Sequence, residues 1–135
     1  MKAVIVCLIG ILCGLSIPVS AQNCEGDCFN GKGTLFNKDG TKKFEGETKE
    51  GKYHGKGTLY YFGKKFYEGE YRNGKPDGKG TEFYLNEKVK YEGEYKEGKP
   101  HGEGILYRSD GKKWREGLFE NGKYIGPKPD EDSYK

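Results

Sequence analysis

One phrase recurs along this chain with a period of 23 or 24 residues. It reads "YEGEYRNGKPDGKGTEFY" from Tyr67 and "YEGEYKEGKPHGEGILYR" from Tyr91. Two glycine positions of the phrase keep this period independently. The glycine of "EG" falls at Gly46, Gly69, Gly93 and Gly117, and the second glycine of "GxG" falls at Gly33, Gly57, Gly80 and Gly104. A fixed period of this length indicates a repeat architecture.

Each unit of the repeat reads as a β-hairpin. In "YEGEY" (residues 67–71) aromatic residues and glycine alternate with glutamate, which predicts a strand with one polar face. The turn residues "RNGKPDG" follow, and "GKGTEFY" forms the second strand. Asp39-Gly40 and Asp110-Gly111 suit two-residue hairpin turns between units. We therefore expect an all-β fold: an elongated single-layer antiparallel meander of eight or nine strands, about 40 Å long.

The recurring glycines predict where the core lies. Glycine inside a strand weakens a sheet unless its empty space is used, so we expect rings from neighbouring strands to lie over it. The predicted repeat core combines these glycines with aromatic columns on the same face: Gly46, Gly57, Gly69, Gly80, Gly93, Gly104, Gly117; Phe44, Tyr67, Tyr91; Tyr71, Tyr95, Phe119; Phe36, Tyr60, Phe83, Tyr107. Because one hairpin alone is marginal, each unit needs the next copy to bury its rings.

The first 21 residues are expected to be a cleaved signal peptide. They contain Lys2, an apolar run from Ala3 to Leu15, and the small residues of Val19-Ser20-Ala21 before the expected cut. A retained anchor is the alternative, but the run is shorter than the roughly 20 residues of a membrane span. Lipidation of Cys24 is disfavoured because Asn23 precedes it. The sequence thus predicts a secreted or periplasmic protein.

Two cysteines remain after this cut, Cys24 and Cys28. In an oxidising compartment a Cys24–Cys28 disulfide is the expected state, with free thiols as the alternative. A metal site is disfavoured because two thiolates do not complete a tetrahedral shell. A redox pair is disfavoured because three residues separate the cysteines, where Cys-x-x-Cys is typical.

The charges of the chain are nearly balanced, with 24 Lys and Arg against 21 Asp and Glu. Nucleic-acid-binding proteins usually carry a basic excess, so we expect no nucleic-acid partner. The 11 Tyr and 7 Phe indicate a thin core made largely of rings.

"YEGEYKEGKPHGEGILY" resembles the MORN repeat (membrane occupation and recognition nexus), whose pattern is Tyr-x-Gly-x-aromatic, a glycine turn and Gly-x-Gly. The resemblance covers about residues 29–126, within an expected domain at 22–126. Its units are 44–66, 67–90 and 91–113, with partial units at 29–43 and 114–126. The last unit departs from the pattern, because Arg115 stands where Tyr is expected, Trp114 lies beside it, and no Gly-x-Gly follows "YIG". This unit also resembles the bacterial variant of the repeat, and we expect a bacterial source.

The resemblance implies a scaffolding, dimerising or lipid-contacting module, and such modules accompany many activities. The sequence itself offers no catalytic set, cofactor site or metal site. His54 and His101 occupy equivalent turn positions, Ser109 lies in a turn, and Ser133 lies in the tail. Carboxylate pairs such as Glu68 and Glu70 recur in every unit, which is typical of a solvated sheet face rather than of a glycosidase. We expect no enzyme.

Three binding hypotheses follow for the expected module. The first is a scaffold that binds a protein partner, or a second copy, through a curved aromatic-rich sheet. The second is contact with anionic lipid through Lys42-Lys43, Lys64-Lys65 and Lys112-Lys113, which the near-neutral charge disfavours. The third is carbohydrate binding on exposed rings, and Trp114 is the candidate partner-binding residue. Residues 127–135, with two prolines and an acidic run, read as a disordered tail.

Overall fold

The computed structural model describes residues 23–130 of the 135-residue chain. The expected signal peptide, residues 1–21, and the last part of the expected tail, residues 131–135, lie outside the described residues.

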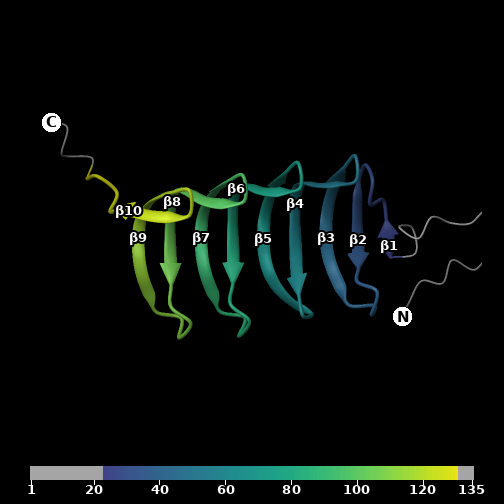
Figure 1. Cartoon of the computed structure of the whole chain (residues 1–135), viewed down its shortest axis with the longest axis horizontal. Coiled ribbons are helices and arrows are strands. Elements are labelled where there is room, and N and C mark those ends of the chain that lie inside the picture. The colour runs from purple at the N-terminus through teal and green to yellow at the C-terminus, as the bar shows by residue number, and fades with distance from the viewer. Residues whose placement is uncertain (1–22, 131–135) are drawn as a thin grey trace, which may run out of the picture.

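The described residues form one antiparallel sheet in which each strand pairs with its neighbours in sequence. The ten strands are β1 (Cys24–Gly26), β2 (Lys32–Phe36), β3 (Lys42–Lys49), β4 (Lys52–Tyr61), β5 (Lys64–Arg72), β6 (Lys75–Phe83), β7 (Val89–Lys96), β8 (Lys99–Tyr107), β9 (Lys113–Glu120) and β10 (Lys123–Gly126). Figure 1 shows them side by side in a single row, with β1 and β10 at opposite ends. The predicted all-β meander is confirmed. Its strand number exceeds eight or nine because short strands, β1 and β10, close both ends.

Two kinds of turn alternate along the sheet. The turns that join β3 to β4, β5 to β6, β7 to β8 and β9 to β10 have two residues with positive φ, such as Asn73-Gly74 (φ 50° and 84°). This geometry matches the right-handed twist of a hairpin. Three of the four turns at the other edge are longer, and these include the turns at Asp39-Gly40 and Asp110-Gly111, which were predicted to have two residues. In the turn after β2, for example, the Asn37 N–H donates to the Thr41 carbonyl and the Gly40 N–H to the Asn37 carbonyl. This makes a three-residue turn that ends on Gly40.

The recurring glycines form a continuous row across the sheet. Each glycine pairs with a glycine on the next strand, from Gly26 on β1 to Gly117 on β9. A Cβ atom placed on Gly80 would collide with the Tyr67 ring, and one on Gly104 would collide with the Tyr91 ring. The rings therefore lie against bare backbone, at positions where no side chain would fit.

The core of this single layer consists of rings packed on rings. Six aromatic side chains are at most 6% exposed: Phe44, Tyr67, Tyr71, Tyr91, Tyr95 and Phe119. Rings of successive repeats meet edge to face, with centroids 5.0 Å apart for Tyr67–Tyr95 and also for Tyr91–Phe119. Such pairs add about 0.5–1.5 kcal/mol beyond the area that they bury. Each repeat thus depends on the next copy for its core.

The expected third aromatic column lies elsewhere than predicted. Phe36, Tyr60, Phe83 and Tyr107 are only half-buried. The Tyr60 hydroxyl donates to Glu45 at 3.3 Å and the Tyr107 hydroxyl to Glu92 at 2.8 Å, so both reach the charged face. Leu35, Leu59 and Leu106 pack on the ring core instead. The strand alternation places Leu59 opposite Tyr67, and it turns the next residue, Tyr60, to the other side.

A loop that contains a disulfide packs against the first repeat. Cys24 and Cys28 are joined by a disulfide, with their Cα atoms 6.2 Å apart. Thr48 occupies the position that Tyr71 and Tyr95 hold in later units. Its N–H donates to the Gly31 carbonyl at 2.7 Å, and its hydroxyl donates to the Asp27 carbonyl at 3.2 Å. The loop therefore takes the place of a preceding repeat.

The last repeat is closed by the residues that follow β10. A Cβ on Gly117 would collide with the Gly126 carbonyl and would lie 2.8 Å from the Cα of Pro127. Lys128 makes an ion pair of 3.0 Å with Glu103 on β8. The start of the expected disordered tail therefore contacts the sheet, because it covers the end of the glycine row.

Candidate binding surface

The residues that could carry chemistry are not gathered into a site. Within residues 23–130, no group of three His, Cys, Asp or Glu residues could hold a metal ion. His54 lies on β4 and His101 on β8, at equivalent positions two repeats apart. Ser109 lies in the turn after β8, and Ser133 lies outside the described residues. The described part of the chain also has no helix that could serve as a membrane span.

The recurring glutamate pairs have a structural role that the sequence analysis missed. The second glutamate of each "EGE" accepts a backbone N–H from the next strand: Glu47 from Lys56 at 2.6 Å, Glu70 from Lys79 at 2.6 Å and Glu94 from Glu103 at 2.9 Å. In the last unit Leu118 takes this position, and no Gly-x-Gly follows. The second glutamate and Gly-x-Gly are therefore absent together from this unit. This coincidence is the signal in the sequence that could have predicted a hydrogen bond between the glutamate and the strand that contains Gly-x-Gly.

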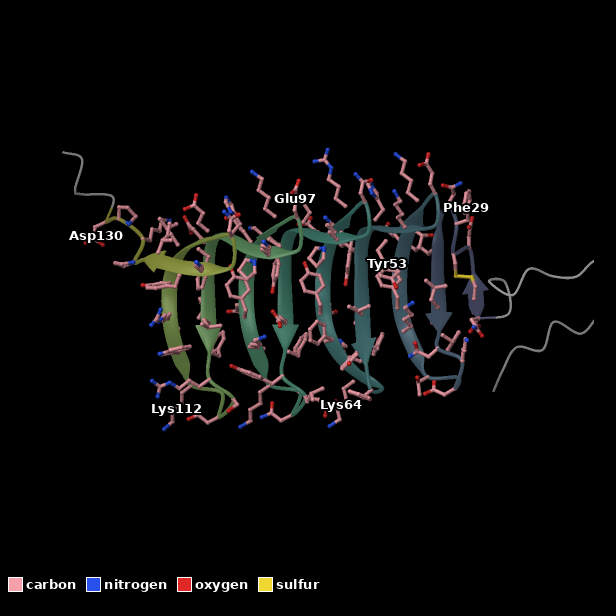
Figure 2. The ribbon with its side chains drawn as sticks, viewed as in Figure 1. Phe29, Tyr53, Lys64, Glu97, Lys112 and Asp130 are labelled. Atoms are coloured by element: carbon pink, nitrogen blue, oxygen red, sulfur yellow. A yellow bond between two sulfur atoms is a disulfide. The ribbon has the colours of Figure 1, made fainter. Side chains whose placement is uncertain are left out.

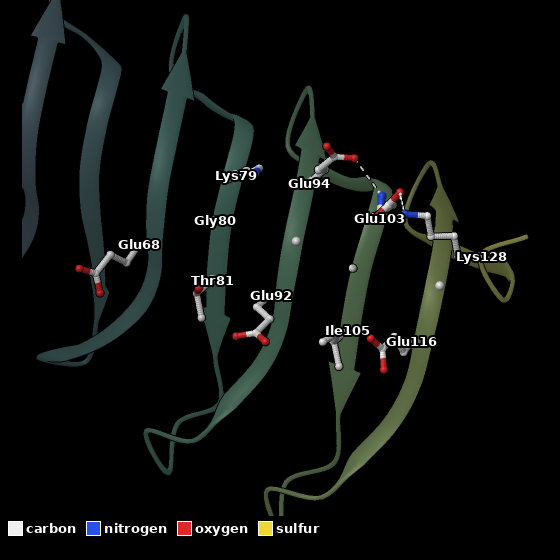
Figure 3. A pocket seen from close by; sticks show the side chains of 13 residues that line it. Glu68, Lys79, Gly80, Thr81, Glu92, Glu94, Glu103, Ile105, Glu116 and Lys128 are labelled. Carbon is white, nitrogen blue, oxygen red and sulfur yellow. Dashed lines mark hydrogen bonds and ion pairs between the residues drawn. The ribbon is translucent and has the colours of Figure 1, made fainter. Parts of the chain in front are cut away.

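The first glutamate of three units faces solvent beside a lysine, whereas Glu92 accepts the Tyr107 hydroxyl at 2.8 Å. Glu45, Glu68 and Glu116 pair with Lys42, Lys65 and Lys113 at 2.8, 2.8 and 2.6 Å. Figure 3 shows Glu68, Glu92 and Glu116 in a row along a groove on the charged face. The groove has a volume of about 630 Å³, and Gly80, Gly93, Gly104 and Gly117 are among its lining residues. Since its carboxylates already have partners within the sheet, the groove does not point to a ligand.

A cluster of exposed aromatic side chains lies around the turn between β4 and β5. Phe62 is 77% exposed, Tyr61 is 55% exposed and Phe66 is 38% exposed. The Tyr61 ring centroid lies 4.4 Å from that of Phe62 and 6.1 Å from that of Phe66. We call these three residues the aromatic cluster. Leu85, at the tip of the next turn along the same edge, is also exposed, and Lys64 Nζ donates to its carbonyl at 3.0 Å.

Trp114, the predicted partner-binding residue, is half exposed near the C-terminal end of the same edge. The Arg115 guanidinium lies 4.7 Å from the centroid of its ring, and the Arg108 guanidinium lies 5.9 Å away. Both distances fall in the range of cation–π contacts. The indole is accessible, but arginines already occupy part of its surface, which leaves less of the ring for stacking on a sugar.

The lysine pairs considered for lipid contact lie at the edge that carries the aromatic cluster. Figure 2 labels Lys64 and Lys112 at this lower edge, and Phe29 and Glu97 at the opposite edge. Of the three pairs, Lys42, Lys65 and Lys113 already neutralise carboxylates of the charged face. The accessible surface at this edge therefore combines aromatic side chains with cations.

The repeats match a known family. The family model of the MORN repeat matches residues 44–62, 67–86 and 91–113, and these matches begin at the buried rings Phe44, Tyr67 and Tyr91. A search of curated proteins found no match. MORN repeats are generally non-catalytic scaffold modules that bind proteins or membranes. With three consecutive matches on consecutive hairpins of one meander, this chain is a MORN-repeat protein.

Proposed function

We propose that this protein is a non-enzymatic scaffold that binds a protein partner in an extracytoplasmic compartment, secreted or periplasmic. The observation that carries the proposal is the aromatic cluster. In a molecule that buries six rings in its core, Tyr61, Phe62 and Phe66 face solvent together. Exposed aromatic residues that lie together are typical of the anchors of protein interfaces.

Two features support the proposed location. The amino-terminal stretch has the composition of a signal peptide, and the Cys24–Cys28 disulfide fits an oxidising compartment. The contact surface differs from the sheet face that the sequence analysis favoured. Six rings of that face are at most 6% exposed, and Tyr53 and Tyr124 are partly buried against them, so this face stabilises the array and offers a partner little surface. We place the contact on the exposed rings of the turns instead.

A lipid or polysaccharide partner is the second candidate. It is favoured by one observation, the lysines that flank the aromatic cluster at Lys64 and Lys65. Cations beside aromatic rings also suit an anionic headgroup or an acidic glycan.

Mild cross-linking of the full chain in its own cell envelope, followed by purification, tests the proposal. Protein, lipid and glycan are all analysed in the purified material. We expect a discrete protein in fixed stoichiometry, or a dimer of the chain itself. Recovery of anionic lipid alone, released as salt is raised, or of polysaccharide alone, would contradict the proposal and favour the second candidate.

A further inference from the structure

The charges of this protein are unevenly distributed, although their sum is small. Four segments meet along one long edge of the sheet, at the bottom of Figure 1: residues 37–43, 61–66, 84–90 and 108–115. We call these segments the basic edge. They contain eleven Lys and Arg but three Asp and Glu, a net charge of +8. The other described residues contain eleven Lys and Arg against sixteen Asp and Glu, a net charge of −5.

Part of this positive charge is neutralised within the sheet. Four lysines of the edge pair with glutamates outside it, as Lys90 does with Glu82 at 2.7 Å. The other seven cations make no ion pair among residues 23–130. Two of the three acidic side chains accept hydrogen bonds within their own turns: Asp39 from the Thr41 N–H and Asp110 from the Lys112 N–H. An attractive field for an anionic partner therefore remains along the edge.

The most exposed apolar side chains of the edge lie at its centre, and Trp114, 50% exposed and covered in part by arginines, is the exception near the C-terminal end. The two middle turns present Phe62, 77% exposed, and Leu85, 56% exposed. The outer turns present only polar tips, Lys38-Asp39-Gly40 and Ser109-Asp110-Gly111. An apolar centre within a charged rim is the anatomy of a protein interface. A bilayer would meet all four tips along a straight edge, and polar tips do not enter its hydrocarbon region.

The backbone at Phe62 gives an independent reason to connect this ring with binding. Phe62 has φ of 50°, a left-handed conformation that a bulky side chain rarely adopts. Among the equivalent two-residue turns, Asn73 and Asn121 hold this position at the same φ of 50°, and Glu50 and Glu97 hold it at 52° and 49°. None of these four turns has an aromatic residue there. Phenylalanine is thus a poor choice for the turn, and its exposed ring adds nothing to the core. A conflict of this kind with local structure is typical of functional positions.

We infer that the partner is an acidic protein surface with an apolar pocket, which docks on the basic edge around Phe62. This inference rests on the proposed function and names the chemistry of the partner. Charge complementarity brings the acidic surface to the edge and orients it, and the ring of Phe62 supplies the apolar contact. Lys64, bonded to the Leu85 carbonyl, holds the two central turns together before the partner arrives.

The first step of the test identifies the protein that touches the edge. A photoreactive benzoylphenylalanine replaces Phe62 in the full chain, in its own cells, and cross-linked proteins are identified by mass spectrometry. Ile125 on β10, 59% exposed, provides the matched apolar position far from the edge. We expect one protein with an acidic surface to be captured from position 62 and not from position 125.

The second step measures the affinity of that purified protein for variants of the edge. Phe62→Asn removes the ring and creates the Asn-Gly turn used elsewhere in the sheet, so the melting temperature is kept or raised. We expect it to raise Kd about thirtyfold, as for an interface hot spot.

Charge reversal tests the cations of the edge. The double variant Lys38→Glu with Lys112→Glu should weaken binding at least tenfold and reduce its salt dependence. The control, Lys52→Glu with Lys99→Glu at the opposite edge, changes the net charge equally and should leave Kd within about twofold.

Several results would overturn the inference. One is a captured protein whose surface is basic, and another is equal weakening by both charge reversals. A third is binding to phosphatidylglycerol vesicles that depends on Phe62 when no protein is captured, which would identify a membrane surface. If a protein is captured only from position 125, the scaffold function stands and the basic edge is not its site. If neither position captures a protein, the inference fails, and the proposed function fails as well when mild cross-linking of the full chain also recovers no protein.

Discussion

At the scale of single residues, the two glutamates of one "EGE" motif make different interactions although they are only two positions apart and lie on the same face. Glu68 makes an ion pair with Lys65 in which both side chains are about half exposed, and Glu70 accepts the backbone N–H of Lys79 at 2.6 Å. Exposed ion pairs contribute about 0–1 kcal/mol, whereas a hydrogen bond to a charged group contributes about 1.5–3 kcal/mol. Sequence alternation alone assigns both residues to the same solvated face.

This difference gives a prediction for a matched pair of variants. Glu70→Ala should lower the free energy of unfolding by about 1–2 kcal/mol, because the Lys79 N–H loses its charged acceptor. Glu68→Lys should change it by less than about 0.5 kcal/mol, because only an exposed ion pair is lost. Urea unfolding measures both. Equal losses in the two variants would refute the structural role of the second glutamate.

The buried tyrosines predict alkaline sensitivity. Burial raises the pKa of Tyr91 to about 12, and it also raises the pKa values of Tyr67, Tyr71 and Tyr95. A tyrosine of the unfolded chain ionises near pH 10, so above that pH the unfolded state loses protons that the folded state keeps. Stability should be independent of these groups below about pH 10 and should fall between about pH 10 and 12.

Thermal melting as a function of pH, followed together with tyrosinate absorbance, tests this alkaline sensitivity. Ionisation of all tyrosines near pH 10 without unfolding would mean that the rings are accessible to solvent.

At the scale of strands and hairpins, the pairing of a ring with a bare glycine determines the packing. The period of the sequence was sufficient to predict the hairpins, the glycine row and the two buried columns that begin with Phe44 and Tyr71. The third column was misplaced because a one-residue step along a strand exchanges the faces of the sheet. The register shift between Leu59 and Tyr60 depends on cross-strand pairing, which no single strand of the sequence reveals.

Glycine substitutions test the packing directly. Gly80→Ala and Gly93→Val should each lower the free energy of unfolding by about 1–3 kcal/mol or more, because the added carbons collide with ring or backbone atoms that already fill the space. At Gly80 the new atom meets the Tyr67 ring, and at Gly93 it meets the Glu103 carbonyl and the Cα of Gly104. The control is Thr81→Ala, next to Gly80 on β6, whose side chain lies on the other face. Unchanged melting of both glycine variants would show that the space above the glycines is not filled.

At the scale of the whole molecule, the protein is a one-dimensional array in which each repeat contacts its neighbours. The sequence predicts this array, but its net charge does not reveal the basic edge. A net charge of +3 sums over all residues, whereas the polarity arises because alternate turns of a meander meet at the same edge. The aromatic cluster was missed for a related reason: periodicity assigns rings to the core, and Phe62 lies in a turn outside the period.

Removing one repeat tests the array. Deletion of residues 67–90 brings Tyr91 into the place of Tyr67 and keeps the phase of the rings, so the shortened chain should fold cooperatively with a lower free energy of unfolding. Deletion of residues 67–78 removes half a unit and should prevent cooperative folding, because rings and glycines no longer align. Circular dichroism during urea unfolding distinguishes the two chains. Equal stability of both would contradict a stack of interlocking repeats.

The most direct test of the whole account compares two proteins in the cell envelope, the wild type and Phe62→Asn. Cross-linked complexes of each are quantified after purification, and the melting temperatures are compared. We expect the wild type to capture a protein partner in fixed stoichiometry, and the variant to lose this partner while melting at the same or a higher temperature. Equal capture by the two proteins would contradict the assignment of the exposed turn as the binding surface.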